Sequence, residues 1–427
     1  MRFGGLFCAV ALAVAMEGVR SGAGTSARTA SADSGATFSA DLRFLRQHTP
    51  IVVLRDAGGE SLVAVAPAWQ GRVMTSSAQG SQGRSFGWIN RKLIASGQRL
   101  PHFNPLGGED RLWLGPEGGQ FSIYFAQGAP FDLEHWFVPA AFDTRSFDVV
   151  ERARDHITLK ASFDLTNHSG SHFDGRVQRT VRVLSSDQAW QALSLPLMNG
   201  IALVAYESKN SLTNAGRTAW SKGTGLLSIW ILGMFNPSPA ATIVIPIKPG
   251  ADAELGARVT SDYFGPIPND RLRVSDRAVF LRADGQFRSK VGVNPKRSLG
   301  RLGSYDAAHH VLTVVQFDQP QGVTDYVNSL WKLQKDPYGG DAANAYNDGP
   351  PAPGAPPMGP FFELESSSPA AALGPGETLS HTHRTIHLVG SEEQLDAVSR
   401  AVLGLSLAEI ESAFAGAGAA SSGSAHP

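Results

Sequence analysis

The stretch His156-Ile-Thr-Leu-Lys-Ala-Ser-Phe-Asp-Leu-Thr-Asn167 alternates apolar and polar residues along most of its length. Successive side chains of a β-strand point to opposite faces, so one face of this segment is apolar and the other is polar. The pattern predicts a half-buried antiparallel strand with one face on a core and the other toward water.

Similar apolar runs recur along the chain between turn residues. Asp56-Ala-Gly-Gly59 is typical of a hairpin turn, and it separates two apolar segments, 51–54 and 61–67. The 46 Gly and 26 Pro residues imply many turns, and short runs between turns are typical of an all-β fold. Further strands are expected at 177–184, 201–208, 241–247, 278–283 and 311–317.

Few segments have the spacing of a helix. The apolar residues of 324–335 recur at helical spacing, which predicts an amphipathic helix. Ser391-Glu-Glu-Gln394 and Ser406-Leu-Ala-Glu409 are capping boxes, so two short helices should begin there and pack on the sheet.

The two ends of the chain differ from the middle. Residues 1–24 combine a charged start, an apolar core and small residues, which is the pattern of a secretory signal peptide. Residues 25–36 resemble a polar linker, and 416–427 are rich in Ala, Gly and Ser and are expected to be disordered. The remaining residues, 37–415, are expected to form a single domain.

The only cysteine, Cys8, lies inside the signal segment. Lipid attachment is an alternative, although the bulky Phe7 before Cys8 makes a poor lipobox. Cleavage near Gly24 leaves no cysteine, and an exported protein without disulfides fits a bacterial periplasm. We expect a periplasmic or secreted protein that is not stably inserted in a membrane after signal cleavage. The 37 basic and 38 acidic residues nearly cancel, so no nucleic-acid partner is expected.

Two carboxylates near the C-terminus mark a candidate site. Glu363 and Glu365 are two residues apart in an otherwise apolar run, so they share one face of a predicted strand. Carboxylates are costly to place in apolar surroundings unless something binds them. The sequence therefore predicts a site here without naming its reaction.

Several motifs resemble those of a known superfamily. Glu365-Ser-Ser-Ser-Pro369, followed by Leu373-Gly-Pro-Gly-Glu377, resembles the C-terminal signature of galactose-mutarotase-like proteins, the aldose 1-epimerase superfamily. Pro67-Ala-Trp-Gln-Gly-Arg-Val73 resembles an early turn of that superfamily, and Leu212-Thr-Asn-Ala-Gly216 with Leu232-Gly-Met-Phe-Asn236 resembles its central block. The resemblance implies that the domain is a large antiparallel supersandwich with a few short helices.

The resemblance also implies a chemistry. Aldose 1-epimerases open a sugar ring with a Glu as general base and a His as general acid, and Glu365 matches the base. Met234 stands where the acid His is expected, and Leu106 stands where a second sugar-contacting His is expected. Neither side chain can exchange a proton, which argues against ordinary mutarotation.

Other residues could rebuild the site. His102 is a possible substitute acid, and the alternative is a loop histidine bonded to a backbone carbonyl. Two blocks, 107–119 and 344–349, resemble an uncharacterised group of exported bacterial proteins in the superfamily, and their polar and aromatic residues suit sugar hydroxyls. The alternative is that these blocks form capped turns, with Trp113 in the core. The predicted substrate-binding residues are Arg72, Asn104, Glu109, Arg111, Trp113, Tyr346, Asn347, Asp348 and Glu363.

Metal binding is a minority interpretation, and neither a metal nor another cofactor is predicted. Oxygens between Asp341 and Asp348 could bind Ca²⁺, although their spacing does not match an EF-hand. His381, His383 and His387 should share one face of a strand, and solvated histidines on an edge strand are favoured over a metal site.

These features together predict an exported carbohydrate-active protein that acts on a saccharide in a mutarotase-like cleft. Glu365 is the candidate base and His102 the candidate acid, for an isomerase, lyase or hydrolase reaction. The alternative is a non-catalytic carbohydrate-binding protein that has lost the epimerase histidines.

Overall fold

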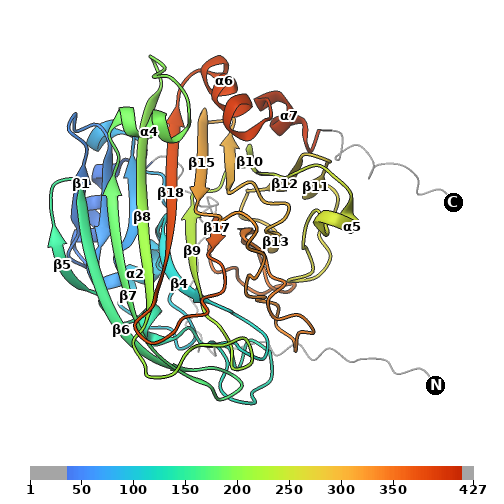
Figure 1. Ribbon diagram of the computed structural model, residues 1–427. Helices are drawn as coiled ribbons and strands as arrows, with labels where there is room; N and C mark the ends of the chain where they lie inside the picture. The colour runs from blue at the N-terminus through green and yellow to red at the C-terminus, as the bar shows by residue number, and fades with distance from the viewer. Residues whose placement is uncertain (1–35, 416–427) are drawn as a thin grey trace, which may run out of the picture.

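Three antiparallel sheets form the framework of residues 36–415, the part of the chain that the computed structural model describes (Figure 1). The predicted signal peptide at 1–24, the linker apart from its last residue, and the tail at 416–427 lie outside the described residues. The smallest sheet contains β1 (Val52–Arg55), β2 (Leu62–Ala66) and β3 (Arg72–Ser77).

The largest sheet has ten strands. In spatial order they are β11 (Leu272–Val274), β12 (Ala278–Arg282), β10 (Ala241–Pro246), β14 (Arg301–Asp306), β15 (Val311–Phe317), β18 (Thr378–Val389), β8 (Ala202–Asn214), β7 (His172–Val183), β6 (His156–Thr166) and β5 (Asp148–Arg152). A five-stranded sheet has the order β13 (Ser289–Val293), β16 (Ala343–Asn347), β17 (Phe362–Ser367), β9 (Ser228–Phe235) and β4 (Arg111–Gly115).

The helices are short. They are α1 (Phe38–Arg46), α2 (Arg91–Ser96), α3 (Ala140–Asp143), α4 (Ser186–Ala192), α5 (Asp252–Leu255), α6 (Glu392–Leu403) and α7 (Leu407–Ser412), with 3₁₀ turns η1 (Pro67–Trp69) and η2 (Gly80–Gln82). Among the described residues, none of these helices is long and apolar enough to cross a bilayer.

The prediction of an all-β fold with a few short helices is confirmed. β6 buries Ile157, Leu159 and Phe163 as its alternation predicts. The hairpin at 56–59 joins β1 to β2, and each of the five further predicted strands is present. Both capping boxes begin a helix, at Ser391 for α6 and Ser406 for α7, and these two helices lie together over one end of the large sheet (Figure 1).

The predicted helix at 324–335 is wrong, because this segment is irregular. Its apolar residues serve two different cores: Tyr326 packs in one cluster, and Val327 with Trp331 packs in another. Its polar side chains bond nearby backbone groups instead, since Asn328 accepts a hydrogen bond from Leu330 N at 3.1 Å. Such local bonds compete with helix formation.

The prediction of solvated edge-strand histidines is also wrong. β18 lies inside the large sheet between β15 and β8. His381, His383 and His387 do share a face, but each is at most 1% exposed. Ser366 Oγ lies 2.8 Å from both His381 Nε2 and His383 Nδ1. Burial lowers the pKa of His381 to about 3 and that of His383 to about 4, so both imidazoles are neutral.

The five-stranded sheet packs on the large sheet through alternate residues. Leu364 of β17 and Val291 of β13 share an apolar cluster with Ile245 of β10. Each of these strands therefore has one face in the core between the sheets, and the other face points away from it.

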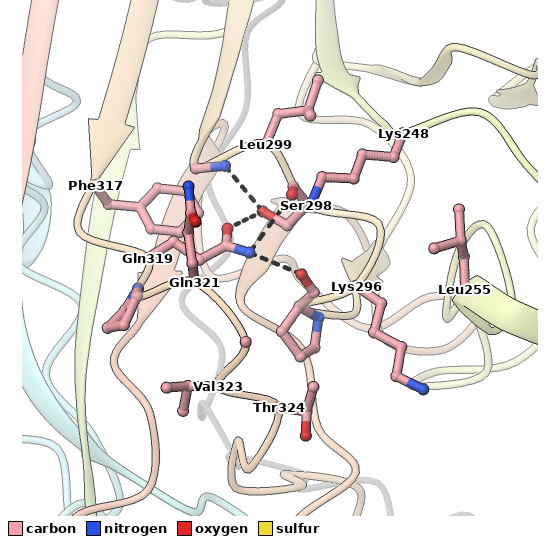
Figure 2. Close-up of a pocket in the computed structure, with 14 residues that line it drawn as sticks. Lys248, Leu255, Lys296, Ser298, Leu299, Phe317, Gln319, Gln321, Val323 and Thr324 are labelled. Carbon is pink, nitrogen blue, oxygen red and sulfur yellow. Dashed lines mark hydrogen bonds between the residues drawn. The ribbon is translucent and has the colours of Figure 1, made fainter.

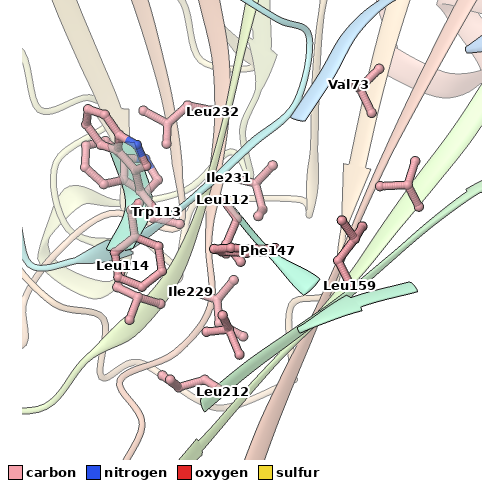
Figure 3. Packing of buried hydrophobic residues seen from close by; sticks show 14 of the residues in the cluster. Val73, Leu112, Trp113, Leu114, Phe147, Leu159, Leu212, Ile229, Ile231 and Leu232 are labelled. Atoms are coloured by element: carbon pink, nitrogen blue, oxygen red, sulfur yellow. The ribbon is translucent and has the colours of Figure 1, made fainter. Parts of the chain in front are cut away.

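Figure 3 shows this alternation at β4 and β9. Leu112 and Ile231 lie toward Leu159 of β6, whereas Trp113 and Leu232 lie on the other side of their strands. The face that carries Trp113 is the one on which the candidate site is built.

Candidate functional site

The register of four strands gathers charged side chains on the outer face of the five-stranded sheet. Lys290 pairs with Tyr346, Tyr346 with Glu363, and Glu363 with Met234. Cross-strand partners point to the same face, so these four side chains form a row from β13 to β9.

A second row lies one step along the same face. Asn344 pairs with Glu365, Glu365 with Leu232, and Leu232 with Arg111 of β4. Glu363 and Glu365 therefore do share a face, as their spacing in the sequence predicts. A third row adds two indoles, because Trp230 of β9 pairs with Trp113 of β4.

A pocket of about 100 Å³ lies over these rows. Its charged lining consists of the cations Arg111, Arg288 and Lys290 and the carboxylates Glu117 and Glu363. Trp113 and Trp230 line the pocket from the strands, and Trp136 and Trp331 line it from loops. Four tryptophans therefore line the cavity.

The tryptophans are in contact with one another. Trp136 and Trp331 are stacked with ring centroids 5.8 Å apart, and Trp113 meets Trp230 edge to face at 5.5 Å. Because each ring is held by a neighbour, the aromatic wall is formed before any ligand arrives.

Of the two glutamates of β17, Glu363 is the one that reaches the cavity. It is 6% exposed, and it accepts a hydrogen bond from Arg111 Nη2 in a buried ion pair. Burial raises the pKa of Glu363 to about 7, against the attraction of Arg111 and with the help of the neighbouring Glu365. Its proton can therefore exchange near neutral pH.

Glu365 lies behind the cavity wall. It is fully buried, and its Oε2 accepts hydrogen bonds from Lys290 Nζ at 3.1 Å and from Trp230 Nε1 at 2.9 Å. The ammonium of Lys290 also lies 4.6 Å from the centroid of the Trp230 ring. Burial lowers the pKa of Lys290, but the attraction of the carboxylates Glu365, Glu117 and Glu363 raises it by more. The net shift is upward, so Lys290 is charged.

Glu117 brings a second carboxylate to the pocket lining, from the loop after β4. It is half-buried, and its backbone N–H donates to Ser329 Oγ at 3.2 Å. Burial raises the pKa of Glu117, Lys290 opposes the shift, and the charge of Glu365 adds to it. The charges of Glu117, Glu363 and Glu365 all raise the pKa of Lys290.

Comparison with known protein families identifies the family of this chain. Residues 36–414 match the family described as Family of unknown function (DUF6786). The chain belongs to this family. No curated protein matches it in sequence.

Solved structures with a similar fold have low sequence identity to this DUF6786 chain. The Slr1438 protein of Synechocystis sp. PCC 6803 is 11% identical over 80% of this chain and 96% of its own, with a TM-score of 0.46. A galactose mutarotase-like protein of Lactobacillus casei is 12% identical over 79% and 100%, with a TM-score of 0.46. A galactose mutarotase related enzyme of Lactobacillus acidophilus is 10% identical over 79% and 97%, with a TM-score of 0.42.

Four predicted site residues of the DUF6786 chain lie in the pocket itself: Arg111, Trp113, Tyr346 and Glu363. Asp348 lies just outside the lining and supports it, because Tyr346 donates its hydroxyl to Asp348 Oδ1 at 2.5 Å. Asn347 points elsewhere and orders a loop, since its Oδ1 accepts from Gly285 N at 2.9 Å.

Two predicted residues, Arg72 and Glu109, are buried away from the pocket lining. Arg72 Nη1 donates to the carbonyl of Gly107 at 3.0 Å. Glu109 accepts from the backbone N–H and the hydroxyl of Ser76, from Tyr206 at 3.0 Å, and from His387 Nε2 at 3.0 Å. Their polar groups are engaged within the fold, which explains why they stand out in the sequence without lining the cavity.

The remaining two, His102 and Asn104, lie beside the aromatic wall. His102 Nδ1 is 2.7 Å from the carbonyl oxygen of Trp136, and its ring is stacked on Phe137 at 4.2 Å. This is the backbone-bonded arrangement that the alternative to an acid role expects. Asn104 Nδ2 donates to Asp143 Oδ2 at 2.6 Å.

Lys290, Arg288 and Glu117 were missed by sequence reasoning. Arg288 immediately precedes β13 and Lys290 lies within it, and the pairing of β13 with β16 brings this segment to the carboxylates. The signal for Glu117 was present, because it lies in the block 107–119 that carries Arg111 and Trp113.

The segment from Asp341 to Asp348, which is mostly strand β16 rather than a loop, binds protein donors with its first carboxylate. Asp341 accepts hydrogen bonds from Tyr263 at 2.7 Å and from Thr260 at 3.2 Å, and burial raises its pKa to about 6. Within residues 36–415, no group of three or more His, Cys, Asp or Glu side chains is arranged to hold a metal ion.

A larger pocket of about 710 Å³ lies elsewhere, between the loops around residues 248, 296 and 320 (Figure 2). Its lining includes Lys248 and Lys296 and no carboxylate. Ser298 donates to Gln319 Oε1 at 2.7 Å, and Gln319 Nε2 donates to the carbonyl of Pro295 at 2.8 Å. The smaller tryptophan-lined pocket, with its carboxylates, is therefore the candidate for acid–base chemistry.

Proposed function

We propose that this exported protein binds one ring of a saccharide in the tryptophan-lined pocket and acts on it by acid–base chemistry, with Glu363 exchanging the proton. The position of Glu363 supports this most. Its carboxyl group lines the cavity, is held by Arg111, and has a pKa of about 7. A general acid or base is most effective when its pKa is close to the working pH.

The aromatic wall supports a saccharide as the ligand. Indole faces cover the C–H faces of a sugar ring, while charged groups between them can bind hydroxyls. The cavity of about 100 Å³ is smaller than pockets that enclose a drug-sized ligand, which are roughly 300–1,000 Å³. One ring that enters this tryptophan-lined pocket, with the rest of the ligand outside, fits this size.

The motif resemblance assigns the base role to Glu365, and we propose that Glu363 has this role instead. Glu365 Oε2 is occupied by Lys290 and Trp230, and its side chain is fully buried. Glu365 then acts by fixing the ammonium of Lys290 at the edge of the cavity.

Glu117 is the proposed second proton-exchanging group. Its pKa is raised, it lines the same cavity, and it enters from a loop rather than from the sheet. Two carboxyl groups with different surroundings can divide the acid and base roles of one reaction.

A non-catalytic saccharide-binding protein is the second candidate. Met234 favours it, because this thioether lies directly opposite Glu363 and cannot donate a proton.

Product analysis after incubation with a panel of mono- and oligosaccharides tests both candidates. Turnover by the wild type that is lost in Glu363→Gln and in Glu117→Gln supports the enzyme. Saccharide binding without turnover in wild type and variants selects the binding protein, and absence of both overturns the proposal.

A further inference from the structure

The pocket has more hydrogen-bond donors than the protein uses. Arg111 is 2% exposed, yet its Nε and Nη1 have no hydrogen-bond partner among the described residues. The same holds for the indole N–H groups of Trp113 and Trp136, both of which line the pocket. Buried donors are rarely left unpaired in proteins, so each unpaired group requires an explanation.

Arg288 adds a guanidinium without a carboxylate partner. It lines the pocket from the position just before β13, and its Cζ lies 3.8 Å from the centroid of the Phe264 ring. No carboxylate within residues 36–415 forms an ion pair with Arg288, although the other two cations of the pocket are paired, Arg111 with Glu363 and Lys290 with Glu365.

The guanidinium groups of Arg111 and Arg288 and the two indoles have one property in common. Guanidinium and indole N–H groups donate and cannot accept, so they are satisfied by a ligand rich in acceptor oxygens. Neutral sugar hydroxyls bring as many donors as acceptors, whereas a carboxylate brings acceptors only and matches the planar fork of an arginine.

We propose that the saccharide is anionic, and that Arg288 together with the free N–H groups of Arg111 binds its charged substituent, as in a uronic acid unit. This inference rests on the proposed function, because it names the class of saccharide for the same pocket. A sulfate or phosphate ester would present the same acceptor chemistry, and the test separates these sources.

Calorimetric titration of the purified protein provides the test. The probes are galacturonate oligosaccharides, galactose oligosaccharides of the same length, and the 6-sulfated and 6-phosphorylated sugars. We expect the galacturonate series to bind on the order of tenfold more tightly than the neutral series, as a charge-assisted bidentate contact implies.

Variants locate the effect. Arg288→Gln should remove most of the preference for the anionic saccharide, and Arg288→Lys, which keeps the positive charge, should retain part of it. Trp113→Phe keeps an aromatic ring but removes the indole N–H, so it should weaken binding. Arg400→Gln is the matched control, because Arg400 is an exposed residue of α6 paired only with Asp396. It should bind like the wild type.

Each result bears on a different claim. A preference for the sulfated or phosphorylated sugar that is lost in Arg288→Gln supports an anionic ligand and identifies an ester as its source. Equal binding of neutral and anionic series overturns this inference and leaves the proposed function in place. Binding of neither series, by a protein whose circular dichroism shows the β fold, overturns both.

Discussion

Glu363 of β17 lies directly opposite Met234 of β9, and both side chains line the same cavity. The carboxylate with a pKa near 7 therefore faces a thioether across the strand pair rather than a second acid. The other carboxyl group that lines the cavity comes from outside the sheet: Glu117, on the loop after β4, is the proposed partner of Glu363 in proton exchange.

Replacing Glu363 by Gln should separate chemistry from binding. The amide keeps the shape and can still accept from Arg111, but it cannot take up a proton at neutral pH. Turnover should fall by roughly 10²–10⁴ while affinity changes little. Initial rates and calorimetric affinities on the same saccharide measure both. Unchanged turnover in Glu363→Gln together with a large loss in Glu365→Gln would return the base role to Glu365.

The pKa of Glu363 also predicts how stability varies with pH. Its folded pKa of about 7 lies above the ordinary value of 4.5, so the folded state holds the proton more tightly. The stability that the folded state gains from this tighter proton binding is fully present below pH 4.5 and is lost as pH rises through 7. Arg111, Lys290, Asp348 and Glu365 all act on this carboxyl group, and the neutral Met234 faces it from β9.

The comparison of wild type with Glu363→Gln tests this dependence. Relative to the wild type, the variant should gain stability between pH 4.5 and 7 and level off above 7. Thermal unfolding from pH 4 to 9 measures the difference in Tm. A difference that is constant over this range contradicts the pKa.

The buried pair of Lys290 and Glu365 should be sensitive to removal of one partner. Lys290→Met leaves the fully buried Glu365 without its cation and should destabilise the fold by about 3–5 kcal/mol. Urea unfolding of Lys290→Met, of Glu365→Leu and of the double variant checks this. The double variant should be more stable than Lys290→Met alone; strict additivity would show that the pair does not interact.

Export is proposed from the sequence, and the mass of the mature protein tests it. Removal of roughly the first two dozen residues is expected, because the charged start is followed by a short apolar core and small residues. Intact-mass measurement of protein from a periplasmic fraction gives the cleavage position. Recovery of an unmodified chain that still contains Cys8 would contradict this proposal.

Slow or absent mutarotation of simple aldoses is a separate expectation. Met234 cannot act as an acid, and Leu106 packs in a small apolar cluster away from the pocket lining. Polarimetry on freshly dissolved glucose and galactose should show little acceleration over the uncatalysed rate. Rapid mutarotation that depends on Glu363 or Glu365 would show that another group supplies the missing acid.

Local patterns predicted the fold well where the local signal and the tertiary environment agree. The alternation of β6 and the capping boxes of α6 and α7 are examples. The segment 324–335 has the apolar spacing of a helix, but its apolar residues are divided between two cores, which no local pattern reveals. His381 looked exposed because it is polar, and it is buried because Ser366 on the facing sheet bonds its ring.

The candidate site was predictable only where its residues stand out from their neighbours in the sequence. Glu363, Arg111 and Trp113 stand out as charged or aromatic residues in apolar or glycine-rich stretches, and they do line the pocket. Lys290 is far from them in sequence, and only the register of β13 brings it in. Conversely, Glu109 is equally conspicuous, but Tyr206 and His387 engage it inside the fold.

The alternation along β17 has a consequence for how this protein can evolve. Leu364 supports the core while Glu363 and Glu365, on either side of it, build the pocket. Exchanging one residue of the outward set can change the chemistry without disturbing the core. Deleting a single residue would turn the carboxylates into the core and the leucine into the cavity. New specificities in this lineage should therefore arise by substitution, with the length of this strand held constant.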